Sequence, residues 1–226
     1  MARYVIVTER PWYRGMAEVL QRKTGHEFRF IDSRDQLTVE YLAALAPRYV
    51  FFPHWSHKIP ETIYDHFECV IFHMTDLPYG RGGSPLQNLI VRGIYRTKIS
   101  ALRCVRELDA GPIYLKRDLQ LEGSAEDIFR CAAQTIAEMI EHLVACEPVP
   151  VEQTGAVVTF ARRKPEQSNM APLSDLDKVY DHIRMLDAEG YPHGFLETEH
   201  LRLEFRRAAR EGDAVIANVV ITKKKP

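Results

Sequence analysis

The sequence predicts an α/β fold, with an open, mostly parallel β-sheet covered by helices and a small α+β appendage at the C-terminal end. Short apolar segments alternate with segments of helical periodicity through residue 145. These apolar segments are nearly continuous rather than alternating with polar residues, which is typical of strands buried on both faces. The last quarter of the chain instead carries a helical segment followed by three strand-like segments.

The elements of the first part follow in order. Gly25 ends the first helix, Pro53 closes the third strand, and Ser84-Pro85 is a typical helix start. Strands are expected at residues 3–8, 28–31, 49–52, 69–72 and 97–105 and from 112, with helical segments at 12–24, 38–45, 60–66, 84–93 and 124–145.

The C-terminal part is predicted as a small α+β unit. A proline-bearing connection, 147–172, contains one expected strand at 157–161. A helix at 174–186 and strands at 194–198, 201–206 and 214–221 come next. Because so few residues cannot build a large core, we expect domains 1–150 and 151–226, with the second packed on the first.

Composition excludes several classes of function. Net charge is −1 over 226 residues and the isoelectric point is about 6.8, so no strong field attracts nucleic acid or an anionic membrane. No apolar run is long enough to span a bilayer, and no signal peptide is indicated. The four cysteines lack Cys-x-x-Cys spacing, so we expect a reduced cytoplasmic protein without a metal site.

Two polar stretches stand out at the ends of expected strands. His73 ends one strand, and three glycines and Ser84 follow it before the next helix. Glycines allow close backbone approach to a ligand, although a plain tight turn would also use them. The second stretch places Asp109 before Gly111; this carboxylate fits either a solvated turn or a partly buried catalytic acid.

Together, these stretches resemble the folate-dependent formyltransferase family, which includes methionyl-tRNA, glycinamide ribonucleotide and sugar N-formyltransferases. The family motif is Asn-x-His, then Leu-Pro-x-x-Arg-Gly, then a turn aspartate. His73, the segment 77–82 and Asp109 match it. The resemblance implies a Rossmann-like formyltransferase fold, catalytic roles for His73 and Asp109, and N10-formyltetrahydrofolate as the formyl donor.

One position departs from the motif, because Ile71 stands where the family has asparagine. Three interpretations are open: a nearby polar residue such as His54, Thr75 or Asn88 substitutes, catalysis uses His73 and Asp109 alone, or transfer activity has been lost. We favour the first two together, with His54 and Asn88 as further catalytic candidates.

The resemblance also assigns binding residues. The donor is expected against Phe52, Pro53, His54, Trp55, Ile71, Leu77, Arg81, Gly82 and Asp109. The acceptor is expected against Arg10, Trp12, Tyr13, Thr75, Asp76, Tyr79, Gly80, Arg81, Arg184 and Tyr191. For Arg184 an internal ion-pair network with Asp181 and Asp187 is the alternative, and Arg10, Trp12 and Tyr13 would equally cap the first helix.

The resemblance is strongest to bacterial sugar N-formyltransferases, because residues 161–166 and 181–192 are similar to segments of these enzymes. We therefore expect an amino sugar as acceptor, nucleotide-linked and destined for a surface glycan or a flagellar sugar such as a pseudaminic acid derivative. A tRNA partner is disfavoured, and a homodimer is left open. The alternatives are a glycinamide ribonucleotide formyltransferase and a folate- or sugar-binding homologue without catalysis.

Overall fold

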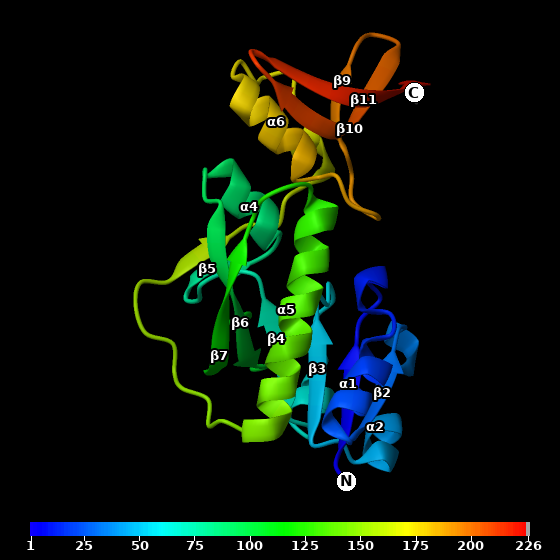
Figure 1. Cartoon of the computed structure of the whole chain (residues 1–226), viewed down its shortest axis with the longest axis vertical. Coiled ribbons are helices and arrows are strands. Elements are labelled where there is room, and N and C mark those ends of the chain that lie inside the picture. The colour runs from blue at the N-terminus through cyan, green and yellow to red at the C-terminus, as the bar shows by residue number, and fades with distance from the viewer. Residues whose placement is uncertain (225–226) are drawn as a thin grey trace. The chain divides into compact units, whose positions relative to one another are not determined.

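A computed structural model describes residues 1–224 and shows a central six-stranded sheet (Figure 1). The strand order is β2-β1-β3-β4-β6-β7. Strands β2, β1, β3 and β4 are parallel, whereas β6 runs antiparallel to β4. This confirms the predicted mostly parallel α/β sheet. The strands are β1 Arg3–Val7, β2 Glu27–Ile31, β3 Tyr49–Pro53, β4 Cys69–His73, β6 Arg96–Arg103 and β7 Ile113–Gln120.

The helices between these strands begin and end at recognisable residues. The Thr38 side chain accepts a hydrogen bond from the Tyr41 amide at the start of α2, and Gly25 ends α1 in a left-handed conformation. The first helix is shorter than predicted, because Pro11–Tyr13 forms a separate 3-10 turn and Gly15 is also left-handed. The helices are α1 Met16–Thr24, α2 Val39–Leu45, α3 Glu61–Tyr64, α4 Pro85–Val91, α5 Ala125–Cys146 and α6 Leu176–Arg184.

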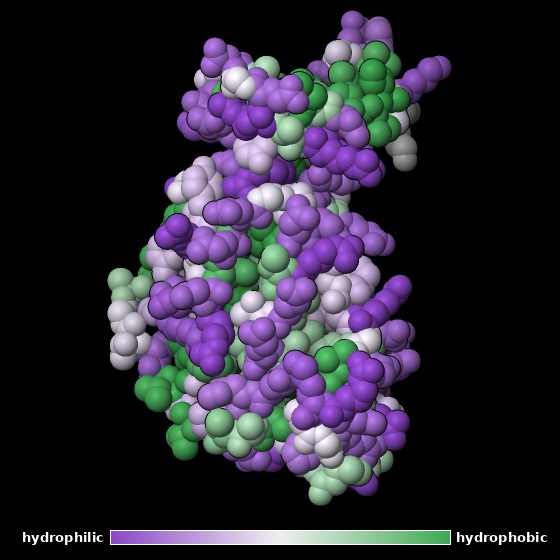
Figure 2. All heavy atoms as spheres, viewed as in Figure 1, coloured by the Kyte–Doolittle hydropathy of each residue, from purple (hydrophilic) through white to green (hydrophobic). Residues whose placement is uncertain are grey.

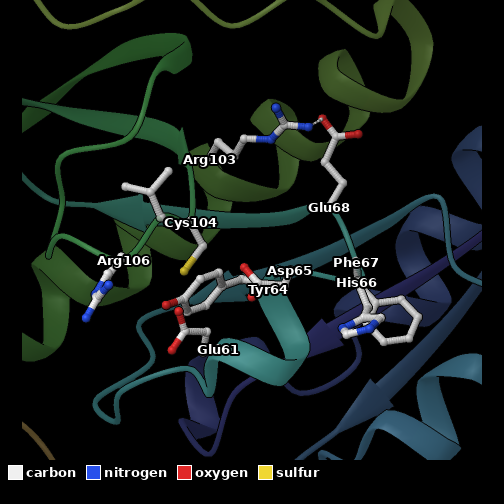
Figure 3. A pocket seen from close by; sticks show the side chains of 10 residues that line it. Glu61, Tyr64, Asp65, His66, Phe67, Glu68, Arg103, Cys104 and Arg106 are labelled. Carbon is white, nitrogen blue, oxygen red and sulfur yellow. Dashed lines mark ion pairs between the residues drawn. The ribbon is translucent and has the colours of Figure 1, made fainter.

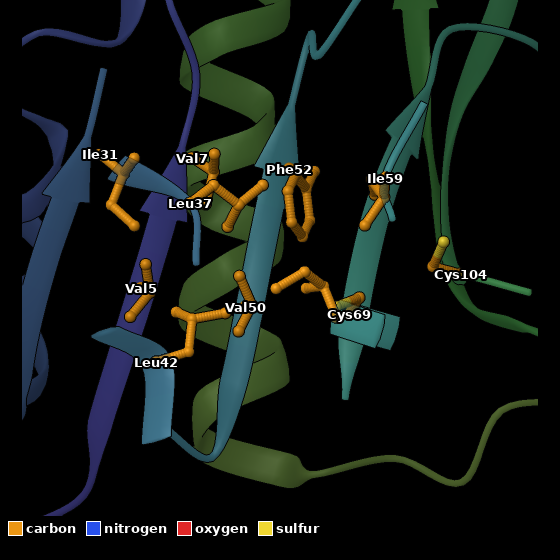
Figure 4. Packing of buried hydrophobic residues seen from close by; sticks show 11 residues of the cluster. Val5, Val7, Ile31, Leu37, Leu42, Val50, Phe52, Ile59, Cys69 and Cys104 are labelled. Atoms are coloured by element: carbon orange, nitrogen blue, oxygen red, sulfur yellow. The ribbon is translucent and has the colours of Figure 1, made fainter. Parts of the chain in front are cut away.

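The core on one face of the central sheet is an apolar cluster (Figure 4). Side chains of β1 and β3, among them Val5 and Phe52, meet Leu42 of α2 and Ile63 of α3. Helix α5 lies on the opposite face in the same view. Burial on both faces explains why these strands are almost continuously apolar in sequence.

The chain forms two compact units. The first contains residues 1–82, 97–119 and 130–159, and the second contains 83–96, 120–129 and 160–226. The predicted division at residue 150 does not coincide with these units, because two earlier segments belong to the second one.

The second unit carries a three-stranded antiparallel sheet in the order β11-β10-β9. The strands are β9 Gly194–Glu197, β10 Leu201–Glu211 and β11 Ala214–Lys223. Helix α6, capped by Asp175, contacts β10 and β11. The short strands β5 Tyr79–Gly82 and β8 Val158–Phe160 form a separate pair; β8 matches the strand expected at 157–161, whereas β5 and the pairing were not predicted. Over residues 1–224, every helix is too short or too polar to cross a membrane.

Candidate functional site

The structure brings His73 and Asp109 together in the first unit. His73 is the last residue of β4, and its Nδ1 lies 3.5 Å from Oδ2 of Asp109. Both side chains are buried, at 7% and 6% exposure. Asp109 adopts a left-handed backbone with φ of 53°, a strained conformation that recurs at functional sites. The solvated-turn interpretation of Asp109 therefore does not hold.

The glycine loop completes the surroundings of this pair. The Gly82 amide donates to Oδ2 of Asp109 at 2.9 Å, and the Gly80 carbonyl lies 2.8 Å from Nε2 of His73. A carbonyl oxygen can only accept, so Nε2 carries a hydrogen. Nδ1, on the side of Asp109, is therefore the ring nitrogen that is not occupied by the Gly80 carbonyl. This arrangement can take up a proton and stabilise the resulting imidazolium.

The segment between His73 and this loop is held by polar contacts. Ser100 of β6 donates its hydroxyl to the Thr75 carbonyl at 2.7 Å. Asp76 pairs with Lys116 and Lys98, and although burial alone would raise the pKa of its carboxyl, the hydrogen bond and charge of Lys116 hold that pKa below its ordinary value. Thr75 is fully buried, and its hydroxyl has no hydrogen-bond partner within residues 1–224. The Asp76 carboxylate is thus paired with two lysines, whereas the Thr75 hydroxyl can still donate a hydrogen bond.

The loop after β3 lies beside the loop after β1 in the same unit. His54 stacks on Trp12 at 5.2 Å between ring centroids, and Arg10 donates to the Ser56 hydroxyl at 3.1 Å. Burial, together with the charge of Arg10, lowers the pKa of His54 to about 3, so its imidazole is neutral at pH 7. The structure thus joins residues predicted for the donor, such as His54, to residues predicted for the acceptor.

Three predicted residues lie in the second unit. The Asn88 side-chain amide donates to the carbonyls of Gly83, Ser84 and Ala161. Arg184 is only 5% exposed, pairs with Asp181 at 2.7 Å and donates to two backbone carbonyls, so its contacts match the internal ion-pair alternative. Tyr191 stacks on Phe129.

The remaining predicted residues lie within the first unit, on the loops just described or on the strands that adjoin them. Of these, Trp55 and Leu77 lie in the loops, Tyr13 ends the 3-10 turn after β1, Phe52 and Pro53 end β3, and Tyr79 begins β5. Ile71 lies in the middle of β4, opposite Phe52 and Leu102. Ile71 is partly buried and offers no polar side-chain atom.

A hollow of about 500 Å³ opens in the first unit (Figure 3). It is lined by Glu61 and Tyr64 of α3, by residues 65–68 between α3 and β4, and by residues 103–106. Tyr64, Cys104 and Arg106 converge on it from the two segments. Burial and the charge of Asp109 raise the pKa of the Cys104 thiol to about 12, so the thiol is neutral. His73 and Asp109 do not line the hollow, but its second segment leads into the Asp109 turn.

Gln153 was missed by the sequence analysis. It lies in the connection before β8, where no periodic pattern or motif marks it, yet it contacts both Arg81 and the Asp109 turn. Within the described part of the chain, no group of three or more His, Cys, Asp or Glu residues is arranged to hold a metal ion.

With the geometry established, comparison with known proteins becomes informative. A family model described as "Methionyl-tRNA formyltransferase, C-terminal domain" matches residues 165–222. A methionyl-tRNA formyltransferase of Bacillus cytotoxicus is 30% identical over 165 residues, covering 68% of this chain and 52% of the relative. The chain therefore spans about half the length of the curated relatives that it matches.

Solved structures extend the comparison over the whole chain. A structure described as methionyl-tRNA formyltransferase from Clostridium thermocellum is 46% identical with a TM-score of 0.96, covering 99% of this chain and 100% of that one. At lower identity, the fold is shared with two further proteins. HypX from Aquifex aeolicus, in complex with tetrahydrofolic acid, is 18% identical with a TM-score of 0.74 over 91% of this chain and 38% of that one. A sugar N-formyltransferase from Shewanella sp. FDAARGOS_354 is 13% identical with a TM-score of 0.73 over 93% and 99%. From the Clostridium match over its full length, we conclude that the chain belongs to the formyltransferase family that includes the methionyl-tRNA formyltransferases.

Proposed function

We propose that this protein transfers a formyl group from N10-formyltetrahydrofolate to the primary amine of an amino sugar, one that is linked to a nucleotide. The observation that carries the proposal is the buried pair of His73 and Asp109, 3.5 Å apart, beside the Gly82 amide. Formyl transfer needs a group that removes a proton from the attacking amine and a negative charge that stabilises that group once protonated.

The proposed chemistry balances through His73. A bond forms between the acceptor nitrogen and the formyl carbon, and the bond between that carbon and N10 of the folate carrier breaks. The amine gives its proton to Nδ1 of His73, the carboxylate of Asp109 stabilises the imidazolium, and the proton then passes to the departing carrier nitrogen. Thr75 is one polar group that supports the proposal that a neighbour replaces the missing asparagine, since its hydroxyl retains a donor.

We place the donor between the loop after β3 and the loop after His73. Trp55 supports this placement, because its Nε1 is buried and has no hydrogen-bond partner among residues 1–224. The HypX structure containing tetrahydrofolic acid supports the folate donor. Titration with a stable folate analogue should show weaker binding by Trp55→Ala, and unchanged affinity across substitutions throughout residues 52–60 would refute the placement.

A second acceptor, methionyl-tRNA, is favoured by the names of the Clostridium and Bacillus proteins. We favour the amino sugar because the net charge of −1 supplies little attraction for a polyanion. The deciding assay offers N10-formyltetrahydrofolate with free amino sugars, nucleotide-linked amino sugars, glycinamide ribonucleotide or methionyl-tRNA. The proposal requires the highest kcat/KM for a nucleotide-linked sugar. If the enzyme prefers methionyl-tRNA, and if its binding to tRNA weakens steeply with salt, then tRNA and not the sugar is the acceptor. Inactivity with every acceptor would favour a binding homologue without catalysis.

A further inference from the structure

We propose that Gln153 is a positioning residue for the proposed transfer. It sets the geometry of Asp109, and it binds the neighbouring Arg81 through a neutral amide, so that no carboxylate cancels the charge of Arg81. The expected effect on the transfer rate rests on the proposed function, whereas the positioning of Asp109 and Arg81 rests on geometry alone. Gln153 lies in neither loop that carries the family motif, so the motif gives no reason to expect it at the site.

The side-chain amide of Gln153 is saturated by four hydrogen bonds. Its Nε2 donates to the backbone carbonyls of Asp109 and Gly111, each at 2.8 Å. Its Oε1 accepts from Nε of Arg81 at 3.1 Å and from Nη2 of Arg81 at 2.8 Å. An amide has two donor hydrogens and two acceptor lone pairs, so every site is used. The orientation is unambiguous, because a flipped amide would face carbonyls with oxygen and a guanidinium with hydrogens.

These contacts hold a turn that has little local support. Asp109 is left-handed, and its own turn contributes only a long hydrogen bond of 3.3 Å between the Ala110 amide and the Glu107 carbonyl. Gly111 is pressed against β6, where an added Cβ would lie 1.9 Å from the Arg103 carbonyl oxygen. A strained turn persists only if its surroundings determine it, and Gln153 fixes the carbonyls at both of these positions.

Gln153 is itself anchored. Two residues earlier, Val151 exchanges two backbone hydrogen bonds of 2.8 and 2.9 Å with Ile113 at the start of β7. The amide therefore bridges a fixed point of the sheet to the catalytic turn. Its other contact, Arg81, immediately precedes Gly82, whose amide donates to the Asp109 carboxylate. One side chain thus sets both sides of that hydrogen bond.

The choice of glutamine has an electrostatic consequence. Arg81 makes no ion pair within residues 1–224, and its observed acceptor is a neutral amide oxygen. A glutamate at position 153 would neutralise Arg81 and place a carboxylate against two carbonyl oxygens. Gln153 therefore fixes the guanidinium without cancelling its charge, which leaves that charge for developing negative charge at the site.

The test compares Gln153→Leu and Gln153→Glu with Gln134→Leu, a matched control on the exposed face of α5. Single-turnover formyl transfer should slow by about 10- to 100-fold in both Gln153 variants, with a much smaller change in the acceptor KM, because misplacing a reacting group costs rate. In an Asp109→Asn background, Gln153→Leu should cost at most about twofold more, since it acts through Asp109. Thermal melts identify variants that fail to fold. If Gln153→Leu fails to fold, Gln153→Glu carries the kinetic test in its place.

A second readout needs no substrate. The Gly82 amide proton, which donates to the carboxylate, should shift upfield in NMR spectra of both Gln153 variants and stay unchanged in Gln134→Leu. An unmoved Gly82 proton, or a rate loss that adds fully to that of Asp109→Asn, overturns the positioning role. If the unaltered protein transfers no formyl group but Gly82 still shifts, the proposed function fails and the positioning role stands.

Discussion

The central sheet and the C-terminal sheet of this protein differ sharply in how they use apolar residues. In the central sheet, Tyr49 to Phe52 of β3 are at most 1% exposed. In the C-terminal sheet, Ile216 and Ile221 of β11 are 50% and 59% exposed, and apolar side chains gather on the surface of that sheet (Figure 2). Strands of similar apolar sequence thus contribute to a core in one place and to a surface in the other.

This difference in burial indicates which strands can hold a side chain in a fixed position. β4 is fixed on both faces, so the position of His73 at its end is fixed as well. The strands β10 and β11 have mostly exposed or partly exposed residues, so their positions depend mainly on backbone pairing and on α6. We therefore expect substitutions in the first region to change chemistry and stability strongly, and substitutions in β11 to change both weakly.

The largest expected effect is on the rate of formyl transfer. His73→Asn and Asp109→Asn should each lower the single-turnover rate by about 10²–10⁴-fold, the usual contribution of a positioned acid–base group. The double variant should be little slower than either single one, because the two residues act as a unit. Val220→Ala in β11 is the matched control and should retain the normal rate constant. Folded His73 and Asp109 variants with near-normal rates would contradict the assignment.

The next effect is on stability and uses the same substitution in both sheets. Val50→Ala in β3 should lower the free energy of unfolding by about 2–3 kcal/mol, because it removes buried methyl groups and leaves a cavity. Val220→Ala, where the side chain is 44% exposed, should cost less than about 1 kcal/mol. Urea denaturation measures both. Equal losses of unfolding free energy in the two variants would show that β11 is buried in solution, and the proposed difference between the two sheets would then be wrong.

The central sheet was largely predictable from sequence, and the details of the site were not. Apolar runs such as residues 49–52 and 69–72 identify buried strands from local composition, and the motif around His73 and Asp109 predicts the pair that the structure brings together. The antiparallel direction of β6 and the β5–β8 pair depend on contacts between distant segments, which no local pattern encodes. Local propensity also extended the first helix across Gly15, where the chain turns.

Side-chain roles were harder to predict than strands, for a physical reason. An amide or guanidinium fits a structural or a binding role equally well until its partners are known. Asn88 and Arg184 bond to carbonyls and Asp181 inside their own unit, whereas Gln153, which has no distinguishing sequence context, contacts the Asp109 turn. The His73–Asp109 pair was predictable because its spacing recurs in a known family.

The smallest expected effect concerns acid stability and compares Glu68, which immediately precedes β4 of the central sheet, with Glu197 of β9 in the C-terminal sheet. Burial alone would raise the pKa of Glu68, but hydrogen bonds from Tyr114 and Arg48 outweigh it and hold the pKa below its ordinary value. Hydrogen bonds from Lys224 and Arg202 likewise lower the pKa of Glu197 in the C-terminal sheet. A lowered folded-state pKa means that the ionised carboxylate stabilises the fold above its unfolded pKa and that this stabilisation is lost as the pH falls through the folded pKa.

Glu68→Gln should therefore lower the free energy of unfolding at pH 7 by about 1 kcal/mol, and its difference from the unaltered protein should shrink as the pH falls toward 3. Glu197→Gln should give a difference too small to follow with pH, because exposed ion pairs are screened by solvent and salt. Urea midpoints between pH 3 and 7 measure both variants, and added salt should leave the Glu68 difference largely intact, since its partners Arg48 and Tyr114 are partly buried. A pH-dependent loss as large for Glu197→Gln as for Glu68→Gln would mean that the C-terminal sheet excludes water as the central sheet does, and the contrast in burial between the two regions would then fail.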